Sequence, residues 1–97
     1  MPQDYAQAVK WYRLAADQSY AGAHYHLGVM YNLGQGVPED YVEAHKWFNL
    51  SASRAPADTF EKHIRDSAAM SRDRVAGLMT PAQIAEAQKR ASAWQPK

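Results

Sequence analysis

The chain has 97 residues, enough for one compact domain and too few for two. Eleven Lys and Arg residues against ten Asp and Glu residues leave a formal net charge of +1, and the charges alternate along the chain. This balance argues against nucleic acid and against an anionic membrane surface as partners, because both favour clustered basic residues. Cysteine is absent, which excludes disulfides, thiol catalysis and cysteine-ligated zinc.

Nothing in the sequence predicts membrane insertion. No stretch approaches the roughly 18 apolar residues of a membrane-spanning helix, and the first residues lack the apolar segment of a signal peptide. The sequence is compatible with the cytoplasm and, if an export signal was removed, with the periplasm.

An internal repeat organises the N-terminal half. Residues 4–16 (DYAQAVKWYRLAA) align with residues 40–52 (DYVEAHKWFNLSA) at a period of 36, and seven positions are identical, including a tryptophan. Each copy opens with a capping-box pattern, an Asp followed three residues later by Gln or Glu. These pairs are Asp4 with Gln7 and Asp40 with Glu43. We therefore predict two equivalent helices that begin at these caps.

Each predicted helix has an apolar surface wider than one stripe. At 100° per residue, aromatic and small residues share one face, and a Trp and a Leu lie on a different face. The first set is Tyr5, Ala8, Tyr12 and Ala16 with the equivalents Tyr41, Ala44, Phe48 and Ala52; the second is Trp11 and Leu14 with Trp47 and Leu50. Such a surface fits a helix packed between two layers, as in stacked helical hairpins. The equivalence of the two tryptophans predicts core packing for both, rather than a stacking platform for a ligand.

Residues 21–33 predict the first helix of a hairpin whose second helix is the second repeat copy. Its apolar face carries Ala23, Leu27, Met30 and Tyr31. The linker 34–39 contains Gly34 and Gly36, which can take positive φ, and Pro38, which stops helix propagation. The linker is therefore predicted to be a tight connection between antiparallel helices.

This hairpin resembles the Sel-like repeat, a relative of the tetratricopeptide repeat. The pattern is Ala23-x-x-x-Leu27-Gly28-x-x-Tyr31-x-x-Gly34-x-Gly36-Val37-x-x-Asp40-x-x-x-Ala44-x-x-Trp47-x-x-x-Ser51-Ala52. The match covers residues 21–53, and half a repeat precedes it in residues 4–18. The resemblance implies an all-α fold, a right-handed α/α solenoid of antiparallel helical hairpins. It also implies that Gly28 permits close approach of the helices and that the two linker glycines shape the loop.

Residues 57–94 do not repeat the motif and predict two further helices. A long helix is predicted from Ala57 to Leu78, and Thr80 with Gln83 then forms another capping box before a last helix that runs to about Trp94. The apolar side of the last helix carries Ile84, Ala87, Ala91 and Trp94. This segment resembles the closing part of Sel-like arrays. We expect it to cap the last hairpin within a single domain that spans residues 1–97.

No residue pattern predicts catalysis, a cofactor or a metal site. His24 and His26 lie about 200° apart on a helix, while His45 and His63 have no acidic partner at a ligand-like spacing. The two linker glycines lie between helices and lack the following lysine of a phosphate loop. We predict histidines that are packed or solvated and a protein that is not an enzyme.

The resemblance implies an adaptor or scaffold that binds another protein or peptide. On the first hairpin helix, Tyr25, Val29 and Asn32 lie away from the predicted core face, so these three are the candidate partner-binding residues. The alternative to partner binding is that these three residues are simply exposed on the surface.

Further alternatives concern the N-terminal half repeat, which resembles the second helix of a hairpin without the first. The apolar area left on it makes Tyr5, Trp11, Tyr12 and Leu14 candidates for self-association, as a homodimer or a helix-swapped oligomer. A piece cut from a longer repeat array would show the same apolar area. A regulatory domain of an enzyme is the last alternative.

Overall fold

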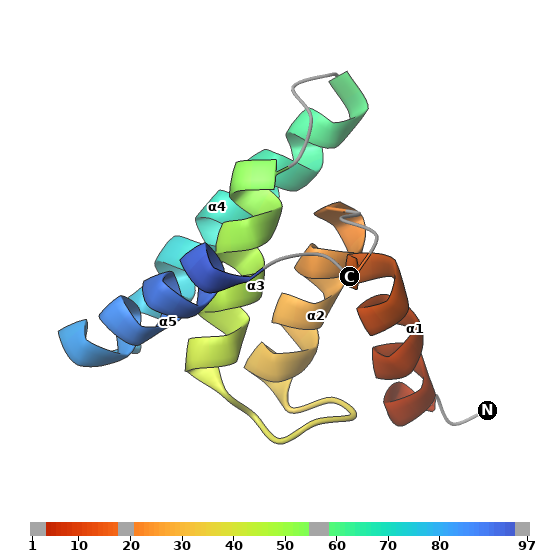
Figure 1. Ribbon diagram of the computed structural model, residues 1–97, viewed down its shortest axis with the longest axis horizontal. Coiled ribbons are helices and arrows are strands. Elements are labelled where there is room, and N and C mark those ends of the chain that lie inside the picture. Colours follow the sequence, from red (N-terminus) through yellow and green to blue (C-terminus); the bar gives the residue numbers. More distant parts are fainter. Residues whose placement is uncertain (1–3, 18–20, 55–58, 95–97) are drawn as a thin grey trace.

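The computed structural model describes residues 4–17, 21–54 and 59–94. These residues form five α-helices and contain no β-strand, so the predicted all-α fold is confirmed (Figure 1). The helices are α1 (Tyr5–Asp17), α2 (Ala21–Leu33), α3 (Tyr41–Arg54), α4 (Thr59–Ala76) and α5 (Pro81–Ala93). Successive helices run in opposite directions, as in a stack of helical hairpins. The predicted boundaries at Gln18 and Ala57 lie outside the described residues.

Helix α3 occupies the centre of the molecule. It packs against α2 on one side and against α4 and α5 on the other, while α1 packs on α2 (Figure 1). Helix α2 also contacts α4. The two helices that follow the repeat therefore cover α3, each through its own contacts with that helix.

The predicted Asp caps are present at the starts of α1 and α3. Oδ1 of Asp4 accepts a hydrogen bond from the backbone N–H of Gln7 (3.0 Å), and Oδ1 of Asp40 accepts one from the N–H of Glu43 (3.1 Å). The return bond expected from the Glu43 side chain to the Asp40 amide is not formed, because that amide donates to the carbonyl oxygen of Tyr31 (2.9 Å). The Glu43 carboxylate is thereby left to pair with Lys46 on its own helix and with Arg90 of α5.

The loop after α2 depends on its two glycines, as predicted. Gly34 and Gly36 have φ values of 70° and 77°. The N–H of Gln35 donates to the carbonyl oxygen of Met30 (2.9 Å), which is the Schellman arrangement with Gly34 just beyond the helix end. Gly36 also lies against α1, since a Cβ there would come within 2.5 Å of the carbonyl oxygen of Tyr5.

Helices α2 and α3 approach closely at Gly28, as the family resemblance implies. A Cβ on this residue would lie 2.6 Å from Cδ1 of Phe48, a separation that real Cβ atoms do not tolerate. The core around this contact takes residues from all five helices, with Leu27 and Phe48 at its centre. Its buried members are Val9, Ala16, Ala23, Leu27, Met30, Tyr31, Ala44, Trp47, Phe48, Leu50, Val75 and Ala91.

Helix α4 ends at Ala76, two residues before the predicted end at Leu78. The N–H of Leu78 donates to the carbonyl oxygen of Val75 (2.8 Å). This is an i→i−3 bond of the 3₁₀ type, so the chain forms a tighter turn here and leaves the α-helix. Leu78, which was predicted to end the helix, consequently lies beyond it and is exposed. Val75, one turn earlier, remains buried.

Helix α5 starts as predicted. Thr80 Oγ1 accepts from the N–H of Gln83 (3.2 Å), Gln83 Oε1 accepts from the N–H of Thr80 (2.9 Å), and Pro81 is the first helical residue. The alanines Ala87 and Ala91 are the buried residues of this helix. Because alanine side chains are small, the backbone of α5 can come close to α3.

Candidate protein-interaction surfaces

The three residues predicted to bind a partner lie on α2 and are all partly exposed. The expectation that they point away from the core is wrong for Tyr25 and Val29, which pack against it. The ring of Tyr25 lies 5.6 Å from that of Phe48, measured between centroids. The physical reason is that α2 has neighbours on several sides, including α4, so the face that carries Tyr25, Val29 and Asn32 is only partly open.

A groove between α2 and α4 begins beside Tyr25. Its volume is about 170 Å³, and it is lined by Tyr25, Ser67, Met70, Ser71 and Arg74. Met70 is 65% exposed and offers an apolar surface next to the tyrosine ring. Arg74 is exposed and makes no ion pair with any residue that the structure describes. The groove therefore combines an apolar part, hydroxyl groups and an unpaired cation.

A second hollow lies between α3 and α5. Its volume is about 290 Å³, and it is lined by Asn49, Leu50, Ser53, Ala91 and Ser92. No charged side chain lines it, and the Asn49 side-chain oxygen already accepts a hydrogen bond from Nη1 of Arg72 (3.2 Å). This hollow results from the small residues with which α5 approaches α3, and it offers a ligand less chemistry than the groove at Tyr25.

The face of α1 proposed for self-association is only partly presented to solvent. Trp11 is 62% exposed and Leu14 is 59% exposed. Tyr5 and Tyr12 instead pack against the core, and the ring of Tyr12 stacks on His26 with centroids 4.7 Å apart. Of the four candidates, Trp11 and Leu14 are thus available for contact.

The equivalence of the two tryptophans did not predict their surroundings correctly. Trp47 is 6% exposed and lies in the core as expected, but the prediction of core packing was wrong for Trp11. Trp47 sits between His24 of α2 and Trp94 at the end of α5, with centroid distances of 5.4 and 5.8 Å. The ammonium group of Lys46 lies over its ring at 4.2 Å. The difference arises because His24 of α2 and Trp94 after α5 both cover the Trp47 ring, whereas no described element covers Trp11 in the same way.

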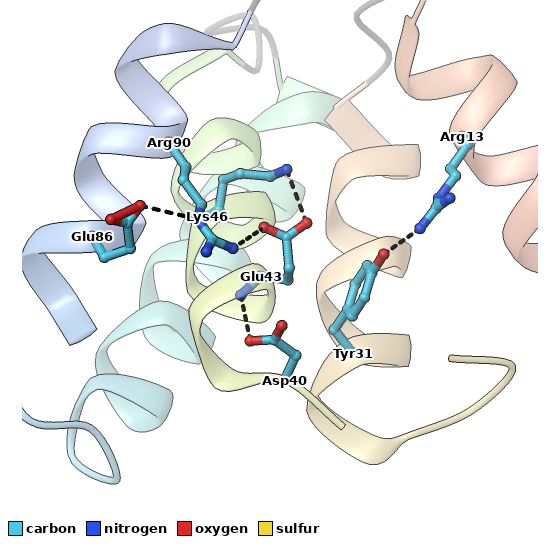
Figure 2. A network of polar contacts seen from close by, with 7 residues as sticks. All are labelled: Arg13, Tyr31, Asp40, Glu43, Lys46, Glu86 and Arg90. Atoms are coloured by element: carbon cyan, nitrogen blue, oxygen red, sulfur yellow. Dashed lines mark hydrogen bonds and ion pairs between the residues drawn. The ribbon is translucent and has the colours of Figure 1, made fainter. Parts of the chain in front are cut away.

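A polar network crosses from α3 to α5 (Figure 2). The Glu43 carboxylate binds Lys46 on its own helix (3.0 Å) and Arg90 on α5 (2.9 Å), and Arg90 also binds Glu86 (3.1 Å). Hydrogen bonds from Arg90 to Glu43 and then to Glu86 raise the pKa of the guanidinium. On the other side of Figure 2, Arg13 of α1 donates to the hydroxyl of Tyr31. These contacts join helices and place no acid beside a base or nucleophile in a cavity.

The four histidines divide into two buried and two exposed residues. His24 and His45 are buried, whereas His26 and His63 are exposed. Burial lowers the pKa of His45, Arg72 lowers it further, and Asp73 acts in the opposite direction. Within residues 4–17, 21–54 and 59–94, no three His, Asp or Glu side chains gather in a way that could hold a metal ion. In the same residues, no helix combines the length and apolarity needed to cross a membrane.

The comparison with known families agrees with the fold. The Sel1 repeat family model matches residues 1–20 and again residues 21–55, which together are more than half of the chain. The half repeat inferred at residues 4–18 lies within the first match, and the complete repeat inferred at residues 21–53 lies within the second. No curated protein and no solved structure shows significant similarity to the chain. The double match, the α2–α3 hairpin and its glycine loop show that the chain belongs to the Sel1 repeat family.

Proposed function

We propose that this protein is a scaffold that binds a segment of another protein in the groove between α2 and α4. Sel1 repeats are generally protein-interaction modules, so a protein partner is the coarse function of the family. The observation that supports this particular surface is the groove at Tyr25, which lies between two neighbouring helices and is open to solvent.

The lining of the groove suits a short piece of protein chain. Met70 and the ring of Tyr25 can contact an apolar side chain, and Ser67 and Ser71 can bond to backbone groups of the ligand. Arg74 adds a cation that no described carboxylate neutralises, so it favours a ligand with a carboxylate next to its apolar residue. Val29 and Asn32 extend the same face along α2 and are expected to contact a longer ligand.

A crosslinking experiment tests this surface in the full chain. A photoreactive amino acid is placed at Met70 and, in a matched control, at Leu78, which is similarly exposed but lies in the turn between α4 and α5. Crosslinks to a partner are expected from position 70 and not from position 78. The captured protein is then purified and its affinity for the unmodified chain is measured by titration calorimetry.

Substitutions in the groove decide whether the captured protein binds there. Arg74→Glu and Met70→Glu are both at exposed positions and are expected to keep the fold while weakening binding roughly tenfold, which corresponds to about 1.4 kcal/mol. Equal affinities for the wild type and both variants, with the helical content unchanged, would refute the proposed surface.

A further inference from the structure

The 36-residue repeat allows one surface of the molecule to be compared in two settings. Trp11 and Leu14 on α1 correspond to Trp47 and Leu50 on α3. The pair on α1 is mostly exposed, whereas the pair on α3 is buried. The helices run in the same direction in the stack, as Figure 1 shows. Helix α1 thus presents to solvent a surface that the chain itself covers on α3.

Helix α5 shows what kind of element fits this surface. Ala87 and Ala91, one turn apart, are buried and let α5 approach α3 closely. Trp94 follows them, and the centroid of its ring lies 5.8 Å from that of the Trp47 ring. The cover is therefore an amphipathic helix with two small residues one turn apart and an aromatic residue after them.

The charges beside the two surfaces are different. On α3, the Glu43 carboxylate forms ion pairs with both Lys46 and Arg90, so this surface favours a covering helix that carries a cation. On α1 the position equivalent to Glu43 is Gln7, and the exposed Lys10 makes no ion pair with any described residue. A carboxylate is the complement of this second surface.

We propose that the face of α1 formed by Gln7, Lys10, Trp11 and Leu14 binds an acidic amphipathic helix of another protein, in the way that α3 holds α5. Small residues of that helix lie over the apolar pair, and an acidic side chain at the place of Arg90 binds Lys10. This face is separate from the groove at Tyr25, and the inference does not rest on the function proposed for that groove.

The charges also disfavour a second copy of this chain as the occupant. Helix α5 of a second copy carries Lys89 and Arg90, which would meet Lys10 as like charges. Like charges on both sides of a contact lower its affinity and select against that partner.

The test uses two labelled peptides and the full chain. The probe is a fluorescent peptide of residues 80–94 with Lys89→Glu and Arg90→Glu, and the matched control is the same peptide without substitutions. The probe keeps the capping box, both alanines and the tryptophan of α5. Fluorescence anisotropy at low ionic strength is expected to show saturable binding of the probe, at least roughly tenfold tighter than the control peptide.

Variants of α1 locate the binding surface. Trp11→Ala is expected to weaken binding of the probe at least roughly tenfold, and Lys10→Glu is expected to reverse the preference between the two peptides. Leu78→Ala, at a similarly exposed residue elsewhere, should leave both affinities unchanged. Circular dichroism checks that each variant keeps its helical content.

Several results would overturn this inference. They are the absence of saturable binding up to about 1 mM probe, equal affinity for the two peptides, or equal affinity of the wild type and Trp11→Ala. Light scattering over a dilution series is expected to show a monomer. A dimer that Trp11→Ala dissociates would assign the face to a second copy and exclude the acidic helix.

Discussion

The side chain of His24 ties α2 to the end of α1, with Nε2 lying 3.1 Å from the backbone carbonyl oxygen of Ala16. A carbonyl oxygen can only accept a hydrogen bond, so Nε2 carries the proton. The same ring lies 5.4 Å from the ring of Trp47 and 4.9 Å from that of Trp94, with His24 fully buried among them. One imidazole therefore connects α1, α2, α3 and the end of α5.

His24→Ala is expected to lower the free energy of unfolding by about 2–4 kcal/mol. The substitution removes a fully buried ring and leaves the Ala16 carbonyl without this donor. Urea denaturation followed by circular dichroism measures the change. His63→Ala, at an exposed residue of α4, is the matched control and should change the stability by less than about 0.5 kcal/mol. Equal effects of the two substitutions would contradict the role assigned to His24.

The helix starts and the loop after α2 could be predicted from the sequence because they depend on local interactions. An Asp three residues before a Gln or Glu favours a helix start through hydrogen bonds within a single turn. Gly34 and Gly36 can adopt positive φ without strain, so their positions indicate the turn directly. The period of 36 then identified the equivalent helices α1 and α3, since both copies have the same apolar spacing.

The surroundings of equivalent residues could not be predicted, because they depend on α5, which lies far along the chain. Trp11 and Trp47 occupy equivalent positions in the repeat, yet only Trp47 is covered by Trp94. The sequence also gave no sign that His24 would meet Trp94, since 70 residues separate them. The partial burial of Tyr25 was missed for a similar reason: the long helix α4 lies beside α2.

His45 is expected to make the stability depend on pH. The folded protein holds this buried side chain neutral, because burial and then Arg72 lower its pKa, with Asp73 opposing them. The unfolded chain takes up a proton near pH 6.5, so it binds more protons than the folded chain below that pH. The free energy of unfolding should therefore fall as the pH decreases from about 6.5, by up to about 1.4 kcal/mol per pH unit until the folded-state pKa is reached.

His45→Val tests the origin of this dependence. The equivalent residue in the first repeat copy is Val9, which is buried, and Nδ1 of His45 has no hydrogen-bond partner among the described residues. At pH 8 the free energy of unfolding of the variant should be within about 1 kcal/mol of the wild-type value. Between pH 7 and pH 5 the variant should become more stable relative to the wild type. Urea denaturation at several pH values measures both proteins. Parallel pH profiles would show that His45 is not the group responsible.

Two glycines of α2 offer a matched test of close packing. Gly28→Ala is expected to lower the free energy of unfolding by about 1–3 kcal/mol, because the new Cβ would lie 2.6 Å from the Phe48 ring. Gly22→Ala meets only Cδ1 of Ile64 at 3.7 Å, so it should be neutral or stabilising by up to about 1 kcal/mol. Thermal denaturation of the two variants distinguishes these outcomes. Similar changes in both would mean that α2 and α3 can separate at Gly28 at little cost.

The last prediction concerns what holds α5 on α3. Ala87→Leu is expected to destabilise the protein by about 1–3 kcal/mol, because Ala87 is fully buried and a larger side chain would push α5 away from the core. Ala85→Leu adds the same atoms at an exposed position of the same helix and should be nearly neutral.

Arg90→Ala removes the ion pair with Glu43 and should cost less than about 1 kcal/mol, since Arg90 is exposed to solvent. Urea denaturation gives all three values under the same conditions. A larger loss in Arg90→Ala than in Ala87→Leu would show that the charge pair, rather than the close approach of the alanines, positions the helix. In that case the Lys10→Glu substitution in α1 should weaken binding of the probe peptide (residues 80–94 with Lys89→Glu and Arg90→Glu) more than the Trp11→Ala substitution does.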